Sequence, residues 1–380
     1  MKIGAVVCEY NPFHAGHKHQ LDVARQSLGL DAVVGIMSGN YVQRGEPALF
    51  PKQLRAAAAL KNGVDLVLEL PAVLTLQSAE RYARNAVMTL DALGCVDTLF
   101  FGAECPETEV LMRIAQVLAD EDEEFRRRLQ AELSKGVSFA AARGNVVKAL
   151  LGPASAEILS QPNNILAVEY CKALLRCKSS IQPYAIPRKG ADHHDREAAE
   201  GIASGTAIRE MFAAGEDPSS YLPENLREDY VQAPKFSVKR METAMLAHLC
   251  MQTPDRLSQI ADVSEGLEYA LLRSAFSANS LGEAIESVKS KRYAYSRIRR
   301  MILNTYLGIT KADGDRLPCY IRILDFNEVG RQVLNHAKST ATLPLAKNGA
   351  QIKNDPTTLA LWQRELALDR VYALFYSGSM

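Results

Sequence analysis

The chain has 380 residues, of which 47% are hydrophobic and 23% charged, a composition typical of a folded globular protein large enough for two domains. Its 44 basic and 44 acidic residues cancel, so the overall charge does not favour nucleic acid and any basic surface must be local. No apolar stretch suits a membrane span or a signal peptide, and the seven cysteines form no Cys-x-x-Cys pair, so we expect a cytoplasmic protein with reduced thiols.

The first predicted element is a buried strand over residues 3–8, which runs into the polar stretch from Glu9 to His17. An Asn-Pro pair stops the strand, and an amphipathic helix is expected to open near His17. His14 and His17 therefore flank Gly16 at a helix N-terminus, where free backbone N–H groups favour an anion. The pattern indicates a nucleotide-phosphate site; two surface histidines or half of a metal site are the alternatives.

Three further strands are predicted over residues 31–37, 65–70 and 96–101, separated by helices over 52–62 and 78–93. This alternation predicts an α/β fold, with a Rossmann-like parallel sheet covered by helices on both faces. Ligands of such sheets bind beyond the carboxyl ends of the strands.

The loops at those carboxyl ends concentrate polar and glycine residues, and we expect them to face one cleft. One loop runs from Ser38 to Ala48, and another from Gly102 to Glu104. A long loop that carries Gln43, Arg44 and Glu46 inside a compact domain is more often functional than a solvated surface loop.

The next part of the chain is helical in pattern, from residue 108 to about 151 and again over 165–175. The charge run within the first stretch is expected to be a solvated helix face without chemistry. Asn163 and Asn164 precede the second helix. One of them is expected to cap it, which leaves the other free to reach a ligand.

A fifth strand is predicted over 181–186, either at an edge of the sheet or with a bulge, because Pro183 cannot donate to a ladder. The polar loop that follows, 187–195, contains Arg188 and Lys189, which are phosphate candidates. Its adjacent histidines also suggest a metal, although neighbours in sequence rarely face the same ion.

A second phosphate-binding pattern follows this loop. Ser204 or Thr206 is expected to cap a helix that carries Ile208 on its inner face. Hydroxyls and Arg209 at a helix start suit a phosphate.

From about residue 235 the chain is almost entirely helical in pattern, except for a strand candidate over 319–324. Residues 288–300 carry six basic residues, two tyrosines and no acid, which suits an RNA backbone and unstacked bases. The alternative is a helix that packs Tyr293 and Ile298 inward with its charges in water. The candidate RNA contacts are Lys289, Lys291, Arg292, Tyr293, Arg297, Arg299 and Arg300.

We place a domain boundary in the Pro-rich polar stretch near residues 219–235. The prediction is an ATP-binding catalytic domain of the nucleotidyltransferase type over 1–225, followed by a helical tRNA-binding domain over 226–380.

Several long motifs resemble the bacterial tRNA(Met) cytidine acetate ligase family, of the His-x-Gly-His nucleotidyltransferase superfamily. They are Glu-Tyr-Asn-Pro-Phe-His-x-Gly-His (9–17), Met-Ser-Gly-Asn-x-Val-Gln-Arg-Gly-Glu-Pro-Ala (37–48), Pro-Asn-Asn-Ile-Leu (162–166), Arg-x-Gly-Ala-x-x-His-Asp (188–195), Ser-Gly-Thr-Ala-Ile-Arg (204–209) and Lys-Arg-Tyr (291–293). The resemblance covers nearly the whole chain.

The resemblance implies a ligase that activates acetate with ATP to acetyl-adenylate and acetylates the wobble cytidine of elongator tRNA(Met), giving N4-acetylcytidine. It places charge stabilisation on His14 and His17, and puts Ser204 and Thr206, with Arg188, on the triphosphate. Mg²⁺ is expected to come with ATP, without a dedicated protein site, and no protein partner is predicted. The implied ATP contacts are Val7, Cys8, Glu9, Tyr10, Asn11, Pro12, Phe13, His14, Ala15, Gly16, His17, Lys18, His19, Gln20, Gly102, Asn163 and Arg188.

The sequence departs from the family pattern at Ala15, where asparagine is common, and at Cys8, where an aliphatic residue is usual. It also departs in the loop after Arg188, where smaller or aromatic residues are usual and this chain has Lys189, Asp192 and His193.

Two alternative functions fit the sequence less well. A small-molecule adenylyltransferase would not need the basic helical part, and a non-catalytic RNA-binding protein would not need both histidines, Arg188 and the 204–209 motif.

Overall fold

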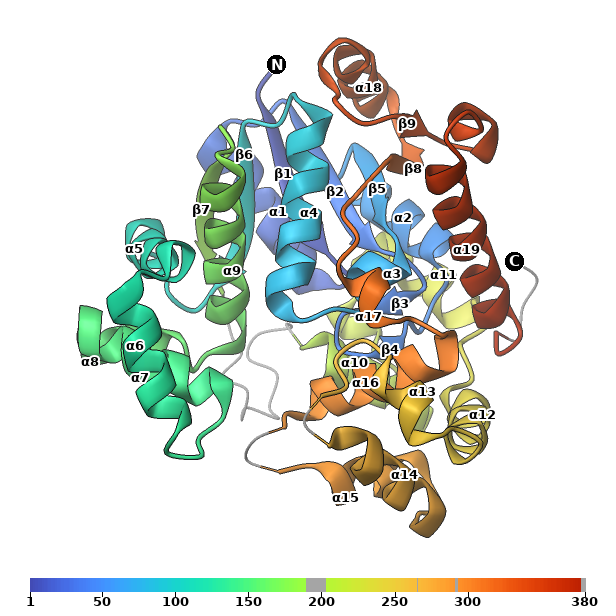
Figure 1. Ribbon diagram of the computed structural model, residues 1–380. Helices are drawn as coiled ribbons and strands as arrows, with labels where there is room; N and C mark the ends of the chain where they lie inside the picture. Colours follow the sequence, from blue (N-terminus) through green and yellow to red (C-terminus); the bar gives the residue numbers. More distant parts are fainter. Residues whose placement is uncertain (189–202, 265, 291–292, 377–380) are drawn as a thin grey trace.

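The computed structural model of the chain describes residues 1–188, 203–264, 266–290 and 293–376 (Figure 1). Its strands are β1 (Ile3–Cys8), β2 (Ala32–Ser38), β3 (Tyr41–Val42), β4 (Glu46–Pro47), β5 (Leu66–Leu70), β6 (Thr98–Ala103), β7 (Gln182–Pro187), β8 (Ile321–Phe326) and β9 (Leu345–Ala346). Seven of them form one sheet in the order β7-β6-β1-β2-β5-β8-β9, and β3 and β4 form a separate hairpin.

The helices of the first half are α1 (Ala15–Leu28), α2 (Lys52–Lys61), α3 (Ala72–Thr75), α4 (Ala79–Leu93), α5 (Thr108–Asp120), α6 (Glu123–Leu133), α7 (Phe139–Leu151), α8 (Pro153–Ile158) and α9 (Pro162–Cys177). Those of the second half are α10 (Gly205–Ala214), α11 (Arg227–Gln232), α12 (Val238–Cys250), α13 (Pro254–Ser258), α14 (Leu267–Ser277), α15 (Leu281–Val288), α16 (Tyr295–Leu307), α17 (Lys311–Gly314), α18 (Glu328–Thr340) and α19 (Pro356–Ala373). Short 3₁₀ turns cover Ser219–Tyr221, Glu224–Leu226 and Gly349–Ile352.

The predicted parallel sheet is confirmed. β1 pairs in parallel with β2 and β6, β2 pairs in parallel with β5, and β6 pairs in parallel with β7. All five predicted strands occur within two residues of their expected ends. β7 lies at the edge of the sheet, which is one of the two alternatives that Pro183 left open, because an edge strand has one side on which no backbone donor is needed.

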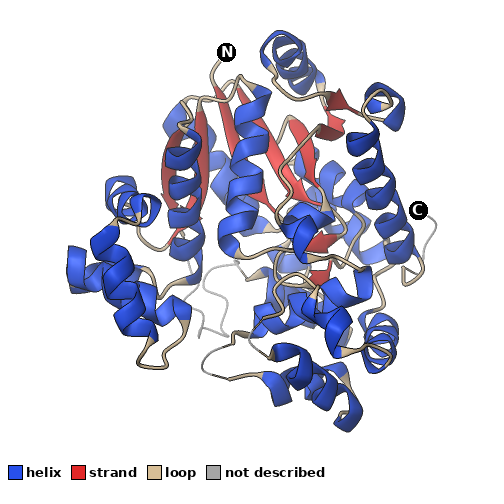
Figure 2. Cartoon of the chain, in the orientation of Figure 1, coloured by secondary structure: helices blue, strands red, loops and turns tan. Residues whose placement is uncertain are grey.

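Helices cover both faces of the sheet (Figure 2). Alternate strand residues divide between two apolar layers: Ile3 and Ala5 of β1 pack on the side of α4, α9 and α18, whereas Val6 and Cys8 pack on the side of α1, α2 and α10. This two-residue alternation is what a strand buried on both faces requires. Because β1, β2, β5, β6 and β7 run parallel, their carboxyl ends lie along the same side of the sheet.

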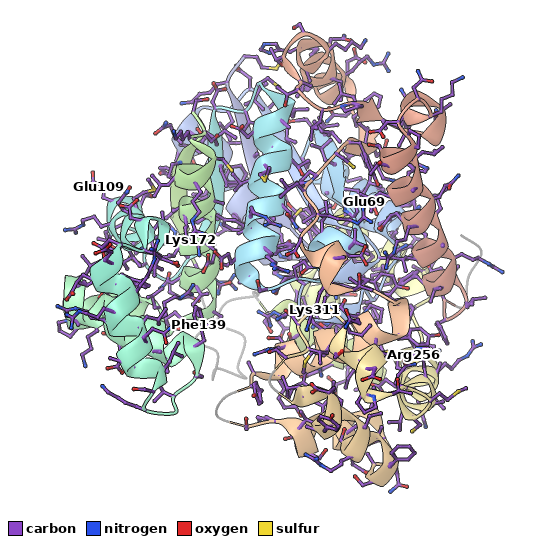
Figure 3. All side chains as sticks on the ribbon, viewed as in Figure 1. Glu69, Glu109, Phe139, Lys172, Arg256 and Lys311 are labelled. Carbon is purple, nitrogen blue, oxygen red and sulfur yellow. The ribbon has the colours of Figure 1, made fainter. Side chains whose placement is uncertain are left out.

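Helices α5 to α8 form an outlying group beside α9 (Figure 1). Lys172 of α9 binds Glu169 at 2.6 Å and Glu80 of α4 at 2.9 Å, and Arg143 of α7 binds Glu169 at 2.7 Å. Lys172 is buried where α9 meets this group of helices, whereas Phe139 of α7 is exposed on the group's surface (Figure 3). The charge run of α6 forms exposed pairs within its own helix, as a solvated face predicts.

The second half is mostly helical, but it also completes the sheet. β8 pairs antiparallel with β5, and β9 pairs in parallel with β8. The division at residue 225 therefore stays a prediction about folding units, since strands on both sides of it share hydrogen bonds. Among the described residues, no helix is both long and apolar enough to cross a membrane.

Candidate nucleotide site

The turn after β1 holds both predicted histidines at the start of α1. The helix begins at Ala15, two residues earlier than expected, because the His14 side chain caps it. His14 Nδ1 accepts a hydrogen bond from the Gly16 N–H at 3.1 Å, and His17 Nδ1 accepts one from the His14 N–H at 3.3 Å. The two imidazoles therefore perform the role that Ser and Glu have in an ordinary capping box.

This capping fixes the tautomer of each ring. A nitrogen that accepts a backbone hydrogen bond carries no proton, so the proton of a neutral imidazole is on Nε2. The ring centroids of His14 and His17 are 3.7 Å apart. The pair thus offers two Nε2–H donors from adjacent rings at a helix N-terminus.

Both histidines are neutral near pH 7. Burial, followed by the charges of Arg188 and Arg209, lowers the pKa of His14 to about 3. Burial, followed by the charge that His14 would carry if protonated and by the charge of Arg188, lowers the pKa of His17 well below its usual value. Two positive guanidinium groups therefore act on the imidazole pair, an arrangement that favours an anionic ligand.

Arg188 follows the edge strand β7 and reaches across the end of β6. Its Cγ lies 3.4 Å from where a Cβ on Gly102 would be, so the Arg188 side chain packs closely against this glycine. Its Nη1 donates to Asn163 Oδ1 at 3.3 Å. The structure thus brings together three predicted ATP contacts from β6, α9 and β7; Lys189 and the rest of that loop lie outside the described residues.

Neither asparagine caps α9, contrary to our expectation, because Gln161 holds the N-cap position without a side-chain hydrogen bond. Asn164 is buried, and its Oδ1 accepts from the Cys105 N–H at 2.8 Å. Asn163 remains partly exposed. These placements favour Asn163 over Asn164 as the ligand contact, which stays a prediction.

The start of α10 lies against the first turn. Of the two predicted caps, Ser204 is the one that caps α10: its hydroxyl accepts from the Ala207 N–H at 3.2 Å. Arg209 Nη1 donates to the Asn11 carbonyl at 2.8 Å, and its Nη2 donates to Thr206 Oγ1 at 3.3 Å. The two motifs, nearly 200 residues apart in sequence, therefore meet at the carboxyl end of β1.

The loop from Ser38 to Ala48 contains the β3–β4 hairpin, which the sequence did not predict because its strands have two residues each. Its Gln43 N–H donates to Glu9 Oε1 at 2.8 Å. Glu46 accepts from Arg209 at 2.9 Å and from Arg299 of α16 at 3.0 Å. The hairpin thus joins the first turn, α10 and the basic helix.

The candidate RNA contacts divide into two kinds. Those of the first kind remain available to a ligand: Arg299 is exposed, and Lys289 lies over the ring of Tyr295, the first residue of α16. Arg300 is only 6% exposed and binds Asp262 at 2.7 Å, so its guanidinium holds the fold together. Arg297 donates to the Asp262 carbonyl and lies over the Tyr293 ring. Lys291 and Arg292 lie outside the described residues.

The remaining predicted ATP contacts differ in exposure. Tyr10, Asn11, Pro12 and Phe13 are buried and shape the turn, and Cys8 is buried between strands. The partly exposed positions are Val7, Glu9, Ala15, Gly16, Lys18, His19 and Gln20. Sequence reasoning gave no role to Glu104, although a carboxylate just after a strand end was a signal of one.

Comparison with known proteins shows the family of the chain. The family model described as HIGH Nucleotidyl Transferase matches residues 1–380. A protein of Thermoanaerobacter sp. (strain X514), named tRNA(Met) cytidine acetate ligase, is 37% identical over 393 residues, covering 100% of this chain and 96% of its own length. A protein of Halothermothrix orenii with the same name is 37% identical, covering 99% and 94%.

Two solved structures are also similar. Thermotoga maritima TmcAL bound with alpha-thio ATP superimposes with a TM-score of 0.91 at 34% identity, covering 100% of this chain and 95% of its own. The apo form has a TM-score of 0.91 at 33% identity, with coverage of 100% and 96%. The predicted fold class is thereby confirmed over the full chain.

Proposed function

The chain belongs to the tRNA(Met) cytidine acetate ligase family of HIGH nucleotidyl transferases, and from this premise we propose that it acetylates the wobble cytidine of elongator tRNA(Met), using acetate and ATP. The observation that carries the proposal is the meeting of the capped His14–His17 pair with the N-terminus of α10 at the end of β1. Donors of two helix starts and the two arginines Arg188 and Arg209 converge there.

The chemistry asked of these groups is adenylation followed by acyl transfer. An acetate oxygen attacks the α-phosphorus of ATP, and pyrophosphate leaves with the electron pair of the broken bond. The cytosine amino group then attacks the acetyl carbonyl, loses a proton and expels AMP. Fixed Nε2–H donors on His14 and His17 would stabilise the charge that develops on the phosphates without the cost of reorienting solvent.

The basic helix α16 supports the tRNA part of the proposal, because the Glu46–Arg299 pair places it beside the nucleotide site. Lys289 and Arg299 are the described candidates for phosphate contacts. A cytoplasmic location fits a tRNA substrate.

Mg²⁺ would accompany ATP through phosphate oxygens. Within the described ranges, three carboxylates lie close enough together to hold an ion: Glu69, Glu365 and Asp369. The ammonium of Lys52 already sits between two of them, at 2.6 Å from Glu69 and 2.5 Å from Asp369. We therefore propose no ion at that cluster.

Exchange of labelled pyrophosphate into ATP tests the first half-reaction. We expect exchange that requires acetate and that falls at least about 100-fold in His17→Ala, the usual cost of one lost transition-state donor. His336→Ala, on the exposed face of α18, is the control and should match wild type. Absence of exchange with any carboxylate, even with tRNA present, would contradict the ligase function and favour a small-molecule adenylyltransferase.

A further inference from the structure

Glu104 lies just beyond the end of β6, and both of its carboxylate oxygens accept hydrogen bonds from the first turn of α9. Its Oε1 accepts from Asn163 Nδ2 at 2.6 Å, and its Oε2 accepts from the Asn164 backbone N–H at 2.8 Å. A third hydrogen bond runs in the opposite direction, from the Cys105 N–H after β6 to Asn164 Oδ1 of α9, at 2.8 Å. The strand end and the helix start are thus held by three hydrogen bonds.

This contact decides which end of the Asn163 amide faces the nucleotide site. A carboxylate only accepts hydrogen bonds, so the amide nitrogen must point at Glu104 and the amide oxygen away from it. Arg188, which only donates, approaches that oxygen at 3.3 Å. An acceptor, Glu104, and a donor, Arg188, therefore fix the same orientation of the Asn163 amide.

Among the described residues, Arg188 is the donor to the Asn163 oxygen, which can accept a second hydrogen bond. A carbonyl oxygen has two lone pairs, and the contact to Arg188 occupies one. An ionised triphosphate has no donor to offer it. The donors of ATP are the ribose hydroxyls and the 6-amino group of adenine, all on the nucleoside part.

We propose that Glu104 is a positioning residue that presents the Asn163 oxygen to a hydrogen-bond donor on the nucleoside part of ATP. The inference deepens the proposed function and rests on its nucleotide site. It also gives the bound nucleotide a direction: the nucleoside lies toward Asn163, and the phosphates lie toward His14, His17 and α10. Arg188, which contacts Asn163 and acts on both histidines, lies between these two ends.

Binding of ATP measured by calorimetry tests this role. Glu104→Gln preserves the shape of the side chain and can still accept from the Asn164 N–H, but it can also donate to Asn163 and so let that amide turn over. We expect ATP binding about tenfold weaker, the effect of one misdirected hydrogen bond. Glu283→Gln is a matched control, because Glu283 accepts a backbone hydrogen bond at the start of α15, in the helical part, and it should bind ATP as wild type does.

Two comparisons show whether Glu104 acts through Asn163. In an Asn163→Ala background, Glu104→Gln should cause no further loss, whereas a full additional loss would overturn the proposal. Inosine triphosphate lacks the 6-amino group, and the 2′- and 3′-deoxy analogues each lack one hydroxyl. The analogue that lacks the recognised donor should bind wild type and Glu104→Gln equally; an unchanged tenfold ratio for all three would overturn the proposal.

The outcome is distinguishable from failure of the proposed function, because ATP binding requires neither acetate nor tRNA. A wild-type protein that binds ATP but shows no acetate-dependent exchange would contradict the ligase function alone. A wild-type protein that does not bind ATP would overturn both.

Discussion

At the scale of single residues, the decisive feature is that His14 and His17 use Nδ1 to cap their own helix. Each ring then has one defined proton, on the nitrogen that remains available to a ligand. Burial keeps the rings neutral, so binding of an anion does not depend on imidazolium charge. The positive charge that acts on the imidazole pair comes from Arg188 and Arg209.

The lowered pKa of His14 predicts how stability depends on pH. The unfolded chain, in which an imidazole titrates near pH 6.5, binds the proton more readily than the folded chain, in which it titrates near pH 3. The free energy of unfolding should therefore fall as the pH drops below about 6.5. The loss attributable to His14 reaches at most about 2 kcal/mol at pH 5.

Urea unfolding at pH 7 and pH 5 measures this effect. His14→Asn keeps a good N-cap residue without a titrating group, so the variant should lose less stability than wild type between the two pH values. His336→Asn, on the surface of α18, should show the wild-type difference. Equal losses in wild type and His14→Asn would contradict the prediction.

At the scale of elements, the β3–β4 hairpin is the joint between the nucleotide site and α16. Gly45 at its turn has φ +82°, and a Cβ there would lie 2.4 Å from the backbone nitrogen of Arg300. The hairpin can approach the helix this closely only without a side chain. Glu46 then reaches Arg209 on one side and Arg299 on the other.

Substitution of this glycine should separate the cost of close approach from that of backbone conformation. Gly45→Ala should destabilise the fold by about 3 kcal/mol, because strain at positive φ adds to overlap with a helix backbone. Gly136→Ala is the control: Gly136 has φ +79° with no atom within 4 Å of the added Cβ, so about 1 kcal/mol is expected. Equal losses in denaturant unfolding would show that the hairpin can move away from α16.

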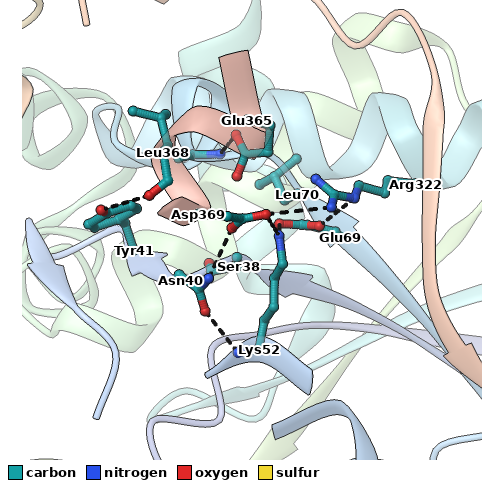
Figure 4. A network of polar contacts seen from close by, with 12 residues as sticks. Ser38, Asn40, Tyr41, Lys52, Glu69, Leu70, Arg322, Glu365, Leu368 and Asp369 are labelled. Carbon is teal, nitrogen blue, oxygen red and sulfur yellow. Dashed lines mark hydrogen bonds and ion pairs between the residues drawn. The ribbon is translucent and has the colours of Figure 1, made fainter. Parts of the chain in front are cut away.

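At the scale of the whole molecule, a buried network of charges binds the C-terminal helix to the sheet (Figure 4). Glu69 of β5 binds Lys52 of α2 and Arg322 of β8, and Asp369 of α19 binds the same Lys52. Glu365 of α19 accepts from the Ala72 N–H at 2.8 Å. Five elements from both ends of the chain therefore depend on one another.

Within the described part of the chain, the network holds three carboxylates but only two cations, Lys52 and Arg322. Both cations pair with Glu69 and Asp369, so the negative charge of Glu365 is the least neutralised. Burial, followed by the charge of Glu69, raises the pKa of Glu365. The folded chain thus holds a proton there that the unfolded chain releases at lower pH, so Glu365 lowers stability increasingly as the pH rises. Glu365→Gln should gain stability relative to wild type between pH 5.5 and pH 8.5, by up to about 1.4 kcal/mol for each pH unit.

Unfolding of both proteins at the two pH values checks this expectation. Glu328→Gln, whose side chain is 74% exposed on α18, is the control and should differ from wild type by the same amount at both. A constant difference between wild type and Glu365→Gln would mean that Glu365 is ionised in the folded protein.

Sequence patterns sufficed to predict the parallel sheet, the special position of the strand with Pro183, a helix opening near His17, a helix capped by Ser204 or Thr206, and the two phosphate motifs, whereas the actual start of α1 at Ala15 depends on the His14 cap. These follow from short-range rules: apolar runs make buried strands, Pro183 avoids the interior of a sheet, and Ser204 caps the helix next to it. Motif order then sufficed to predict the family and the reaction.

Four features follow from packing of the whole chain and not from local pattern: the antiparallel pairing of β8 with β5, the pairing of two arginines with Glu46, the orientation of Asn163 and the burial of Arg300. Each depends on residues that are tens to hundreds of positions apart in the chain. Local pattern does not distinguish an arginine in solvent from one paired with a distant carboxylate, because both occupy the same kind of helix position. Packing of the whole chain brings such partners together, and so determines which charged groups bind ligands and which hold the fold.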